Sequence, residues 1–226
     1  MLVKVKYYNL VSERHKTRST DKGSVMDIAS FDEGAHDIDI VAGLILSADD
    51  GNAARGSPRG SLRVIKNLIR AGNNFLGREH ISLALDEGKI AGLVIGYTGR
   101  GHDELGTLLR LLLSLRLGEL ASYFTVVSKM LHGEYTPDVA PDEYYISLIV
   151  VDENMRGKGV GSFLLNHAIE SAKAEGCRTV LLDVDGENVA ARELYGKFGF
   201  EPSARGTFPG PWPGPPRTVT LELGLA

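Results

Sequence analysis

The 226-residue chain has a single cysteine, Cys177. One thiol cannot form a disulfide within the chain, and it cannot supply a zinc site built from several cysteines. The six histidines are scattered without the spacing of metal ligands, so we predict no metal site. A lone thiol is typical of a reducing compartment, and we expect a cytoplasmic protein in which Cys177 is a small core residue.

The chain also lacks a strong excess of charge, because its formal net charge is only -4. A nucleic-acid-binding protein normally carries a basic face, so this balance argues against a nucleic-acid partner. Residues 1–24 are the exception, being basic on balance. Such a segment could bind anions or could form a solvated edge strand and loop. We treat 1–24 as an N-terminal strand or arm and 25–226 as a single domain.

No apolar run is long enough to predict a membrane span. The most apolar stretch, 105–117, is too short and contains Arg110 and Arg116. The N-terminal stretch carries lysines inside its only apolar run, unlike a signal peptide, so we expect no membrane partner. The stretch 105–117 instead predicts a buried helix in a helical insertion over 103–133. Its leucines are too many for one stripe, which favours a cover over a substrate site, a homodimer contact or a self-contained helical hairpin.

The remaining apolar pattern predicts alternating strands and helices. Helical spacing indicates helices over 38–48, with Asp37 as its cap, and over 61–71. Two apolar runs around Asp86-Glu87-Gly88-Lys89 predict a β-hairpin. Later segments predict strands over 144–151, 178–184, 200–208 and 218–225, helices over 161–175 and 188–197, and a proline-rich connection over 208–217. This order predicts a mixed α/β domain around one central sheet.

A glycine-rich turn joins the strand 144–151 to the following helix, in the sequence RGKGVGS from Arg156 to Ser162. Glycine permits positive φ, and amides at a helix N-terminus bind phosphate oxygens. Arg156 and Lys158 add positive charge. The turn lacks the G-K-[ST] of a P-loop, and it lies too far after its strand for a dinucleotide fingerprint. The pattern therefore predicts a pyrophosphate site, with a purely structural turn as the alternative.

The segment 144–200 resembles the GNAT superfamily of N-acetyltransferases. The family's cofactor motif, R/Q-x-x-G-x-G/A, is matched by Arg156, Gly159 and Gly161. Its next motif is matched by Asn188, Ala191, Leu194, Tyr195, Phe198, Gly199 and Phe200. The resemblance extends loosely over 25–225 and weakens over 103–133. It implies acetyl-CoA as co-substrate and a twisted mixed sheet of about six to seven strands flanked by helices.

The resemblance also implies roles for individual residues. On a strand that splays from its neighbour, the backbone of Ile149, Val150 and Val151 would pair with pantetheine. Asn188 would bind the cofactor or nearby backbone, with a helix cap as the alternative. Tyr195 would be the general acid for the departing thiolate, with a core aromatic as the alternative. The pyrophosphate would be held by the amides of Arg156, Gly157, Lys158, Gly159, Val160, Gly161 and Ser162.

The general base is harder to identify. The strand position at which some family members carry a catalytic glutamate is occupied by Tyr145, and Glu143 lies two residues earlier on the same strand face. Glu143 could reach the acceptor directly or through water, or it could be a solvated carboxylate. His167 lies off the apolar stripe of its helix, so we expect it to be exposed.

The expected reaction is direct attack by a primary amine on the thioester in a ternary complex. The long segments 49–60, 103–133 and 207–217 lie where this fold builds its acceptor wall, and their length favours an enclosed site for a small molecule. A protein or peptide acceptor and a non-catalytic CoA-binding module remain the alternatives.

Overall fold

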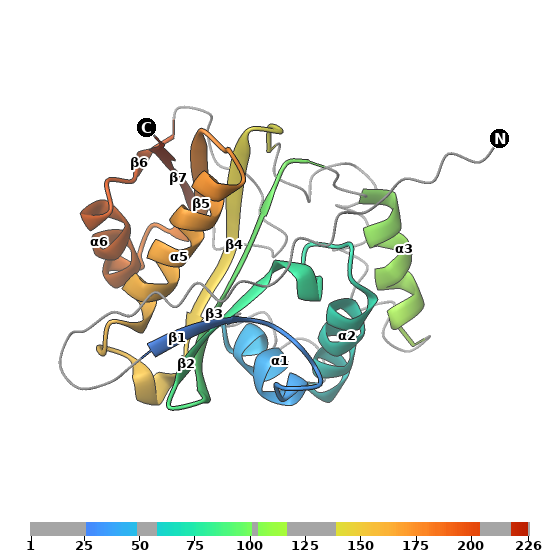
Figure 1. The fold of residues 1–226 in the computed structure, drawn as a ribbon. Helices are drawn as coiled ribbons and strands as arrows, with labels where there is room; N and C mark the ends of the chain where they lie inside the picture. Colours follow the sequence, from blue (N-terminus) through green and yellow to red (C-terminus); the bar gives the residue numbers. More distant parts are fainter. Residues whose placement is uncertain (1–25, 49–57, 101–103, 117–138, 204–217, 226) are drawn as a thin grey trace.

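The computed structural model describes residues 26–48, 58–100, 104–116, 139–203 and 218–225. A seven-stranded sheet in the order β1-β2-β3-β4-β5-β7-β6 forms its centre (Figure 1). Neighbouring strands are antiparallel except β4 and β5, which are parallel. The strands are β1 Met26–Ser30, β2 Ile81–Asp86, β3 Lys89–Thr98, β4 Glu143–Val151, β5 Thr179–Asp185, β6 Glu201–Pro202 and β7 Thr218–Gly224.

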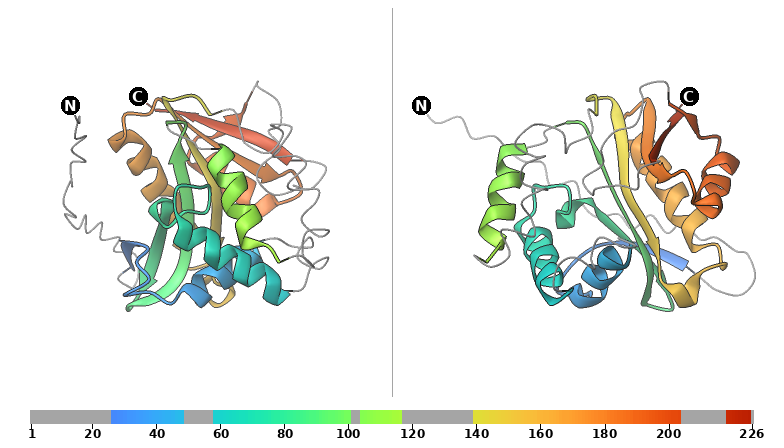
Figure 2. Two further views of the ribbon diagram at one scale, coloured as in Figure 1. Left: turned by 90° about the vertical axis from the view of Figure 1, so that its right-hand side faces the viewer. Right: turned by 180° about the vertical axis from the view of Figure 1, so that it is seen from behind.

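Helices cover both faces of the sheet, which confirms the predicted mixed α/β class (Figure 2). On one face α1 packs against β3 and β4, α2 packs against α1, and α3 packs against α2. On the other face α5 packs against β2, β3 and β4, and α6 lies at its side (Figure 1). The helices are α1 Ile38–Ser47, α2 Pro58–Ala71, α3 Glu104–Ser114, α5 Val160–Ala174 and α6 Val189–Lys197, with 3-10 turns η2 Arg78–His80 and η4 Glu153–Met155.

The predicted hairpin is formed by β2 and β3. Asp86 pairs with Lys89, and the two residues between them, Glu87 and Gly88, have φ values of 49° and 79°. Positive φ at both central positions is typical of the two-residue turns that match the twist of antiparallel strands. The hairpin prediction is therefore confirmed at the level of the turn.

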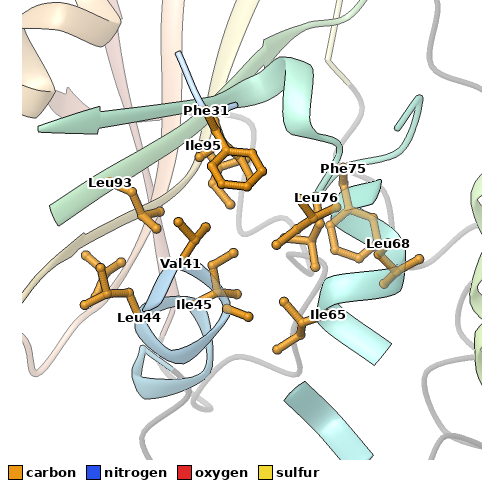
Figure 3. Packing of buried hydrophobic residues seen from close by; sticks show 14 of the residues in the cluster. Phe31, Val41, Leu44, Ile45, Ile65, Leu68, Phe75, Leu76, Leu93 and Ile95 are labelled. Carbon is orange, nitrogen blue, oxygen red and sulfur yellow. The ribbon is translucent and has the colours of Figure 1, made fainter. Parts of the chain in front are cut away.

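The first hydrophobic cluster lies between the sheet and α1 (Figure 3). Val41 and Ile45 of α1 point towards Leu93 and Ile95 of β3, and all four are buried. As predicted, Asp37 caps α1, because its Oδ1 accepts a hydrogen bond of 2.8 Å from the amide of Asp39. The cap and the apolar face together fix α1 on the sheet.

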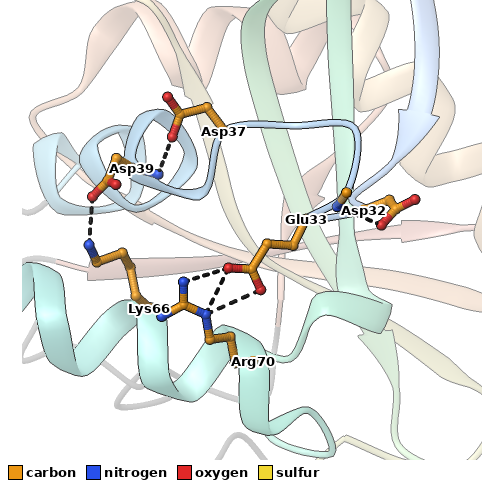
Figure 4. Close-up of polar contacts among 7 residues, drawn as sticks. Asp32, Glu33, Asp37, Asp39, Lys66 and Arg70 are labelled. Carbon is orange, nitrogen blue, oxygen red and sulfur yellow. Dashed lines mark hydrogen bonds and ion pairs between the residues drawn. The ribbon is translucent and has the colours of Figure 1, made fainter.

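Ion pairs fasten α2 to the segment around the start of α1 (Figure 4). The guanidinium of Arg70 donates to the Glu33 carboxylate at 2.5 to 3.2 Å, and Lys66 Nζ lies 2.6 Å from Asp39 Oδ1. The pairs are solvent-exposed, so they orient the helix more than they stabilise it.

The second cluster lies under α5, and Cys177 is buried in it as predicted. The expectation for His167 is wrong, because this residue is half-buried and its Nε2 lies 3.0 Å from Ser82 Oγ. The physical reason is that α5 packs against β2 as well as the strands beneath its apolar stripe, so its flank is also covered.

Helix α3 is the described part of the predicted insertion. Leu108 and Leu111 are buried, while Leu109 and Leu113 are 56% and 78% exposed. Residues 117–138, which contain the predicted second helix, lie outside the described residues. Of the helices that are described, none combines the length and the apolar character needed to cross a membrane.

Two predicted terminal elements lie wholly or partly outside the described residues. The first strand, β1, begins at Met26, whereas the segment 1–24 lies outside the described residues. Of the strand predicted over 200–208, the structure describes Glu201–Pro202, and residues 204–208 lie outside the described part.

Candidate active site at the open end of β4 and β5

Strands β4 and β5 separate halfway along β4. Their pairing begins at Glu143 with Thr179 and ends at Ile146 with Leu182, although β4 continues to Val151. The register between β3 and β4 shifts at the same place, because Ile95 faces Leu148 and Gly96 faces Ile146. Ser147 is therefore the extra residue of a β-bulge, which bends β4 away from β5. The gap between β4 and β5 therefore begins at the bulge.

The backbone of β4 beyond the bulge is directed alternately to β3 and to the gap. The amide of Asp152 donates to the Ala91 carbonyl of β3 at 3.0 Å. Because backbone groups alternate in direction along a strand, Val150 also faces β3, whereas Ile149 and Val151 face the gap. Two of the three residues expected to bind pantetheine thus offer their N–H and C=O groups to the opening, and Val150 does not.

The glycine-rich turn forms the start of α5, next to this gap. Gly157 and Gly159 have φ values of 73° and 82°, and a Cβ built on either would meet no heavy atom within 4 Å in the described structure. Their positive φ requires glycine, and the space beside them is open. A ligand can therefore approach the turn closely.

The first amides of α5 have no partner within the helix, as at every helix N-terminus. Gly159 caps the helix, so Val160, Gly161 and Ser162 contribute these amides, while Arg156 and Lys158 are exposed beside them. Such a terminus suits an anion, and the expected pyrophosphate fits the turn.

Gly161 has a different reason for being glycine. A Cβ there would lie 3.4 Å from Leu194 Cδ2 of α6 and 3.8 Å from Val151 Cγ2. The glycine lets α5 approach both α6 and the open end of β4 closely.

Asn188 occupies the N-cap position of α6. Its Oδ1 accepts a hydrogen bond of 3.1 Å from the amide of Ala191. The structure therefore shows the helix-cap role that the sequence offered as the alternative. Contact with a cofactor stays a prediction.

Tyr195 lies on α6 with its ring in the second cluster and is 9% exposed. The ring packs against Phe200 at a centroid distance of 5.9 Å, and burial raises the pKa of the hydroxyl to about 12. This hydroxyl makes no hydrogen bond within the described part of the chain. Tyr195 is thus a core aromatic whose protonated hydroxyl is left for another partner.

Glu143 lies at the closed end of β4 and is 3% exposed. Its Oε2 accepts a hydrogen bond of 2.8 Å from the amide of Ala140. The carboxylate is therefore not solvated, and it lies away from the gap in a structural contact. The role of base stays a prediction that this position does not favour.

Sequence reasoning did not assign a site role to a partly buried carboxylate at the mouth of the gap. Asp183 directly follows Leu182, the last residue of β5 that pairs with β4. Its Oδ2 accepts from the Tyr145 hydroxyl at 3.0 Å, and its Oδ1 accepts from Thr220 Oγ1 of β7 at 2.6 Å. A signal was present, because an acidic residue interrupts the apolar run of a buried strand.

The Asp183 carboxylate is partly buried and has a raised pKa. It lies on the sheet face that carries α1, as Leu181 and Tyr145 do. Burial raises the pKa of Asp183, and the two hydrogen bonds only partly offset this effect. No basic side chain of the described residues forms an ion pair with it.

Other parts of the described structure offer less to a reaction. A polar cavity of about 360 Å³ lies at the closed end of the strands, where Gly96, Tyr97 and Tyr144 line it together with His167 and Glu175. In the described ranges, no three His, Cys, Asp or Glu side chains form a group that could hold a metal ion.

Similarity to known proteins agrees with this geometry. Two curated relatives are a mycothiol acetyltransferase of Beutenbergia cavernae, 41% identical over 68 residues, and the N-alpha-acetyltransferase MAK3 of Arabidopsis thaliana, 39% identical over 56 residues. These segments cover 30% and 25% of this chain, and only 22% and 30% of the two relatives.

A solved N-acetyltransferase of Staphylococcus aureus Mu50 has the same fold over most of the chain. The TM-score is 0.68 at 23% identity, and the match covers 87% of this chain and 99% of the other. The model of the acetyltransferase (GNAT) family matches residues 57–200, which include the hairpin, the gap, the glycine turn and Tyr195. On this match and this geometry, the chain belongs to the acetyltransferase (GNAT) family.

Proposed function

We propose that this protein transfers an acetyl group from acetyl-CoA to a primary amine by direct attack in a ternary complex. One observation carries the proposal. A glycine turn with open space beside its amides lies next to a gap into which Ile149 and Val151 direct backbone groups that pair with no other strand among the described residues. This combination suits a long ligand with an anionic group at one end and amide groups along its length.

The glycine turn and the gap would each bind a different part of acetyl-CoA. Amides from Gly157 to Ser162 would hold the pyrophosphate, aided by the charges of Arg156 and Lys158. Ile149 and Val151 would pair with the amides of the pantetheine arm. Acetyl-CoA supplies the activated acyl group as a thioester.

The chain contributes position and protons to the reaction. Holding both reactants in the gap lowers the entropic barrier, and a backbone amide of β4 would polarise the thioester carbonyl. The Tyr195 hydroxyl would donate a proton to the departing thiolate. Its pKa of about 12 keeps it protonated at neutral pH, so this proton is always present.

The acceptor in this proposal is the primary amine of a small molecule. A peptide or protein N-terminus is the second candidate, because relatives include enzymes named for mycothiol and for N-alpha acetylation. The length of the segments that we expect to enclose the acceptor favours the small molecule. A cytoplasmic location, expected from the single thiol, belongs to the same proposal.

Two measurements test the proposal. Calorimetry with acetyl-CoA should show binding, and an assay of thiol release over a panel of amines and peptides should show turnover that depends on the acceptor. Small amines should be better substrates than peptides. Absence of acetyl-CoA binding would refute the proposal, and binding without turnover would favour the non-catalytic module.

A further inference from the structure

Asp183 is a partly buried carboxylate that lacks a cation within the described structure. Tyr145 and Thr220 neutralise none of its charge, because both donors are neutral hydroxyls. A buried charge is normally paired, since desolvation is costly. Asp183 lies one residue beyond the last β4–β5 pair. The carboxylate without a cationic partner in the described structure is therefore at the mouth of the gap.

We propose that Asp183 receives the ammonium group of the acceptor and takes its first proton, so that the acceptor is a cationic primary amine. The inference rests on the proposed acetyl transfer and adds to it the charge of the acceptor. Tyr145 and Thr220 are positioning residues, because they hold the two carboxylate oxygens without touching the acceptor themselves. A carboxylate that has accepted two hydrogen bonds still has lone pairs for an ammonium group.

The proton inventory of the reaction is complete with these groups. An ammonium nitrogen loses two protons when it becomes an amide. The first passes to Asp183 and then to solvent, which frees the nitrogen lone pair. The carbon–nitrogen bond then forms as the carbon–sulfur bond of the thioester breaks, and the second proton reaches the thiolate through the Tyr195 hydroxyl.

Two further carboxylates lie on the same sheet face as Asp183. Asp185 lies on the same face of β5 two residues further on, and Glu222 of β7 lies beside Leu181. A neutral hydroxyl compound would gain little from these carboxylates, and an acidic acceptor would be repelled. The proposed site therefore favours an acceptor with a positive charge.

The test compares four variants with the wild type in thiol release from acetyl-CoA. The acceptors are 1,4-diaminobutane, 2-phenylethylamine and an alanine-initiated peptide, each compared with a neutral hydroxyl analogue. The variants are Asp183→Asn, Tyr145→Phe, Thr220→Val and the control Tyr144→Phe. Tyr144 is adjacent and buried but lies on the other face, and its hydroxyl makes no hydrogen bond in the described part.

We expect Asp183→Asn to lower kcat/KM for amines by about 10² or more, as for loss of a general base, with unchanged affinity for acetyl-CoA. Tyr145→Phe and Thr220→Val should each lower it by about 10-fold, because the carboxylate loses one of its two holders. Tyr144→Phe should retain wild-type activity. The neutral hydroxyl analogues should not be acetylated.

The pH profile separates a chemical role from a structural one. Wild-type kcat/KM should fall on the acidic side as Asp183 gains a proton, and Asp183→Asn should lack this limb. Asp185 and Glu222 lie on the same sheet face as Asp183, whereas Tyr145 and Tyr97, which face it from β4 and β3, have pKa values raised by burial and stay neutral there. Retention of the limb in Asp183→Asn would assign it to another carboxylate and overturn the inference.

The outcomes distinguish the two proposals. Turnover of amines that is insensitive to Asp183→Asn, or turnover of hydroxyl analogues at equal rate, overturns the role of Asp183 but leaves acetyl transfer intact. Binding of acetyl-CoA without turnover of any cationic amine overturns the inference and leaves only a binding function. Failure to bind acetyl-CoA overturns the proposed function itself, and the inference with it.

Discussion

The two halves of β4 are built from similar residues but have different neighbours. Residues 143–146 pair with β5, residues 144–146 pair with β3 as well, and the side chains of all four residues are buried. Residues 147–151 pair with β3 alone, and only Val150 among them is fully buried. One half completes the sheet, whereas the other leaves backbone groups for a ligand.

This contrast shows that a binding edge inside a sheet requires no special side chains. The apolar run is continuous across both halves, and its composition is typical of a strand buried on both faces. The opening comes from the single bulge at Ser147 and the departure of β5. The following variants break or sharpen the contrast between the open and the closed half, starting with the largest expected effect.

Gly159→Asp should weaken acetyl-CoA binding by about 10³-fold, because it adds a negative charge where phosphate is expected and a side chain at positive φ. The matched control is Gly176→Asp at the other end of α5, which has a φ of 72° and equally open surroundings. Calorimetry should show near wild-type affinity for the control. Equal affinities in both variants would remove the phosphate site from the glycine turn.

Tyr195→Phe should lower turnover by about 10²-fold without a change in affinity for acetyl-CoA. The effect lies at the lower end of the range for proton transfer, because a hydroxyl with a pKa of about 12 is a weaker acid than a thiol, whose ordinary pKa is about 8.5. Single-turnover kinetics with a good acceptor measure it. A wild-type rate would leave Tyr195 as a core aromatic only.

Two glycines of β3 allow a glycine-to-alanine substitution to be compared beside the two halves of β4. Gly92 pairs with the open half and Gly96 with the closed half. A Cβ on Gly92 would lie 2.7 Å from the Val150 carbonyl oxygen, so the backbone beside the gap must move. A Cβ on Gly96 would lie 2.5 Å from the buried Tyr144 ring, so a side chain must move there and not the backbone.

Both alanine variants should therefore lose about 1–3 kcal/mol of stability from overpacking. Only Gly92→Ala should also weaken acetyl-CoA binding, by about 10-fold or about 1.4 kcal/mol, because only there does the strain act on the ligand-binding edge. Denaturant unfolding and calorimetry measure the two quantities. A loss of affinity in Gly96→Ala of equal size would mean that the halves are not independent.

The smallest effect concerns stability at Asp183. Its pKa is raised above the ordinary 3.8, so the folded state holds the proton more tightly than the unfolded state does. This group therefore favours folding at low pH and loses that contribution as pH rises through its folded pKa. Asp183→Asn should match or exceed the wild-type Tm at neutral pH, with a smaller difference near pH 3.5. A lower Tm at neutral pH would make Asp183 a structural residue.

The local elements could be predicted from the sequence because their causes are local. The turn at Glu87 and Gly88, the cap at Asp37 and the glycines before α5 all act within a few residues. The opening of the sheet was available only through resemblance to a family. Apolar periodicity describes the faces of a strand and does not say whether its edges are paired.

The group around Asp183 could not be found in this way because its members are distant in sequence. Tyr145, Asp183 and Thr220 come from three strands and meet only when β5 is placed between β4 and β7. The same limitation misplaced His167, whose contact with Ser82 joins residues 85 apart. A site assembled across strands requires the register of the sheet.

The bulge at Ser147 also sets the phase of everything after it. Before it, odd-numbered Tyr145 faces α1; after it, even-numbered Leu148 and Val150 do, while Ile149 and Val151 face α5. Which residues of β4 face α5 therefore depends on the one extra residue of the bulge more than on the identity of its side chain. Many residues could replace Ser147, but deletion of this one residue would remove the bulge and the bend that opens the sheet, while Leu148 and Val150 would keep the face and the β3 partners that they have now.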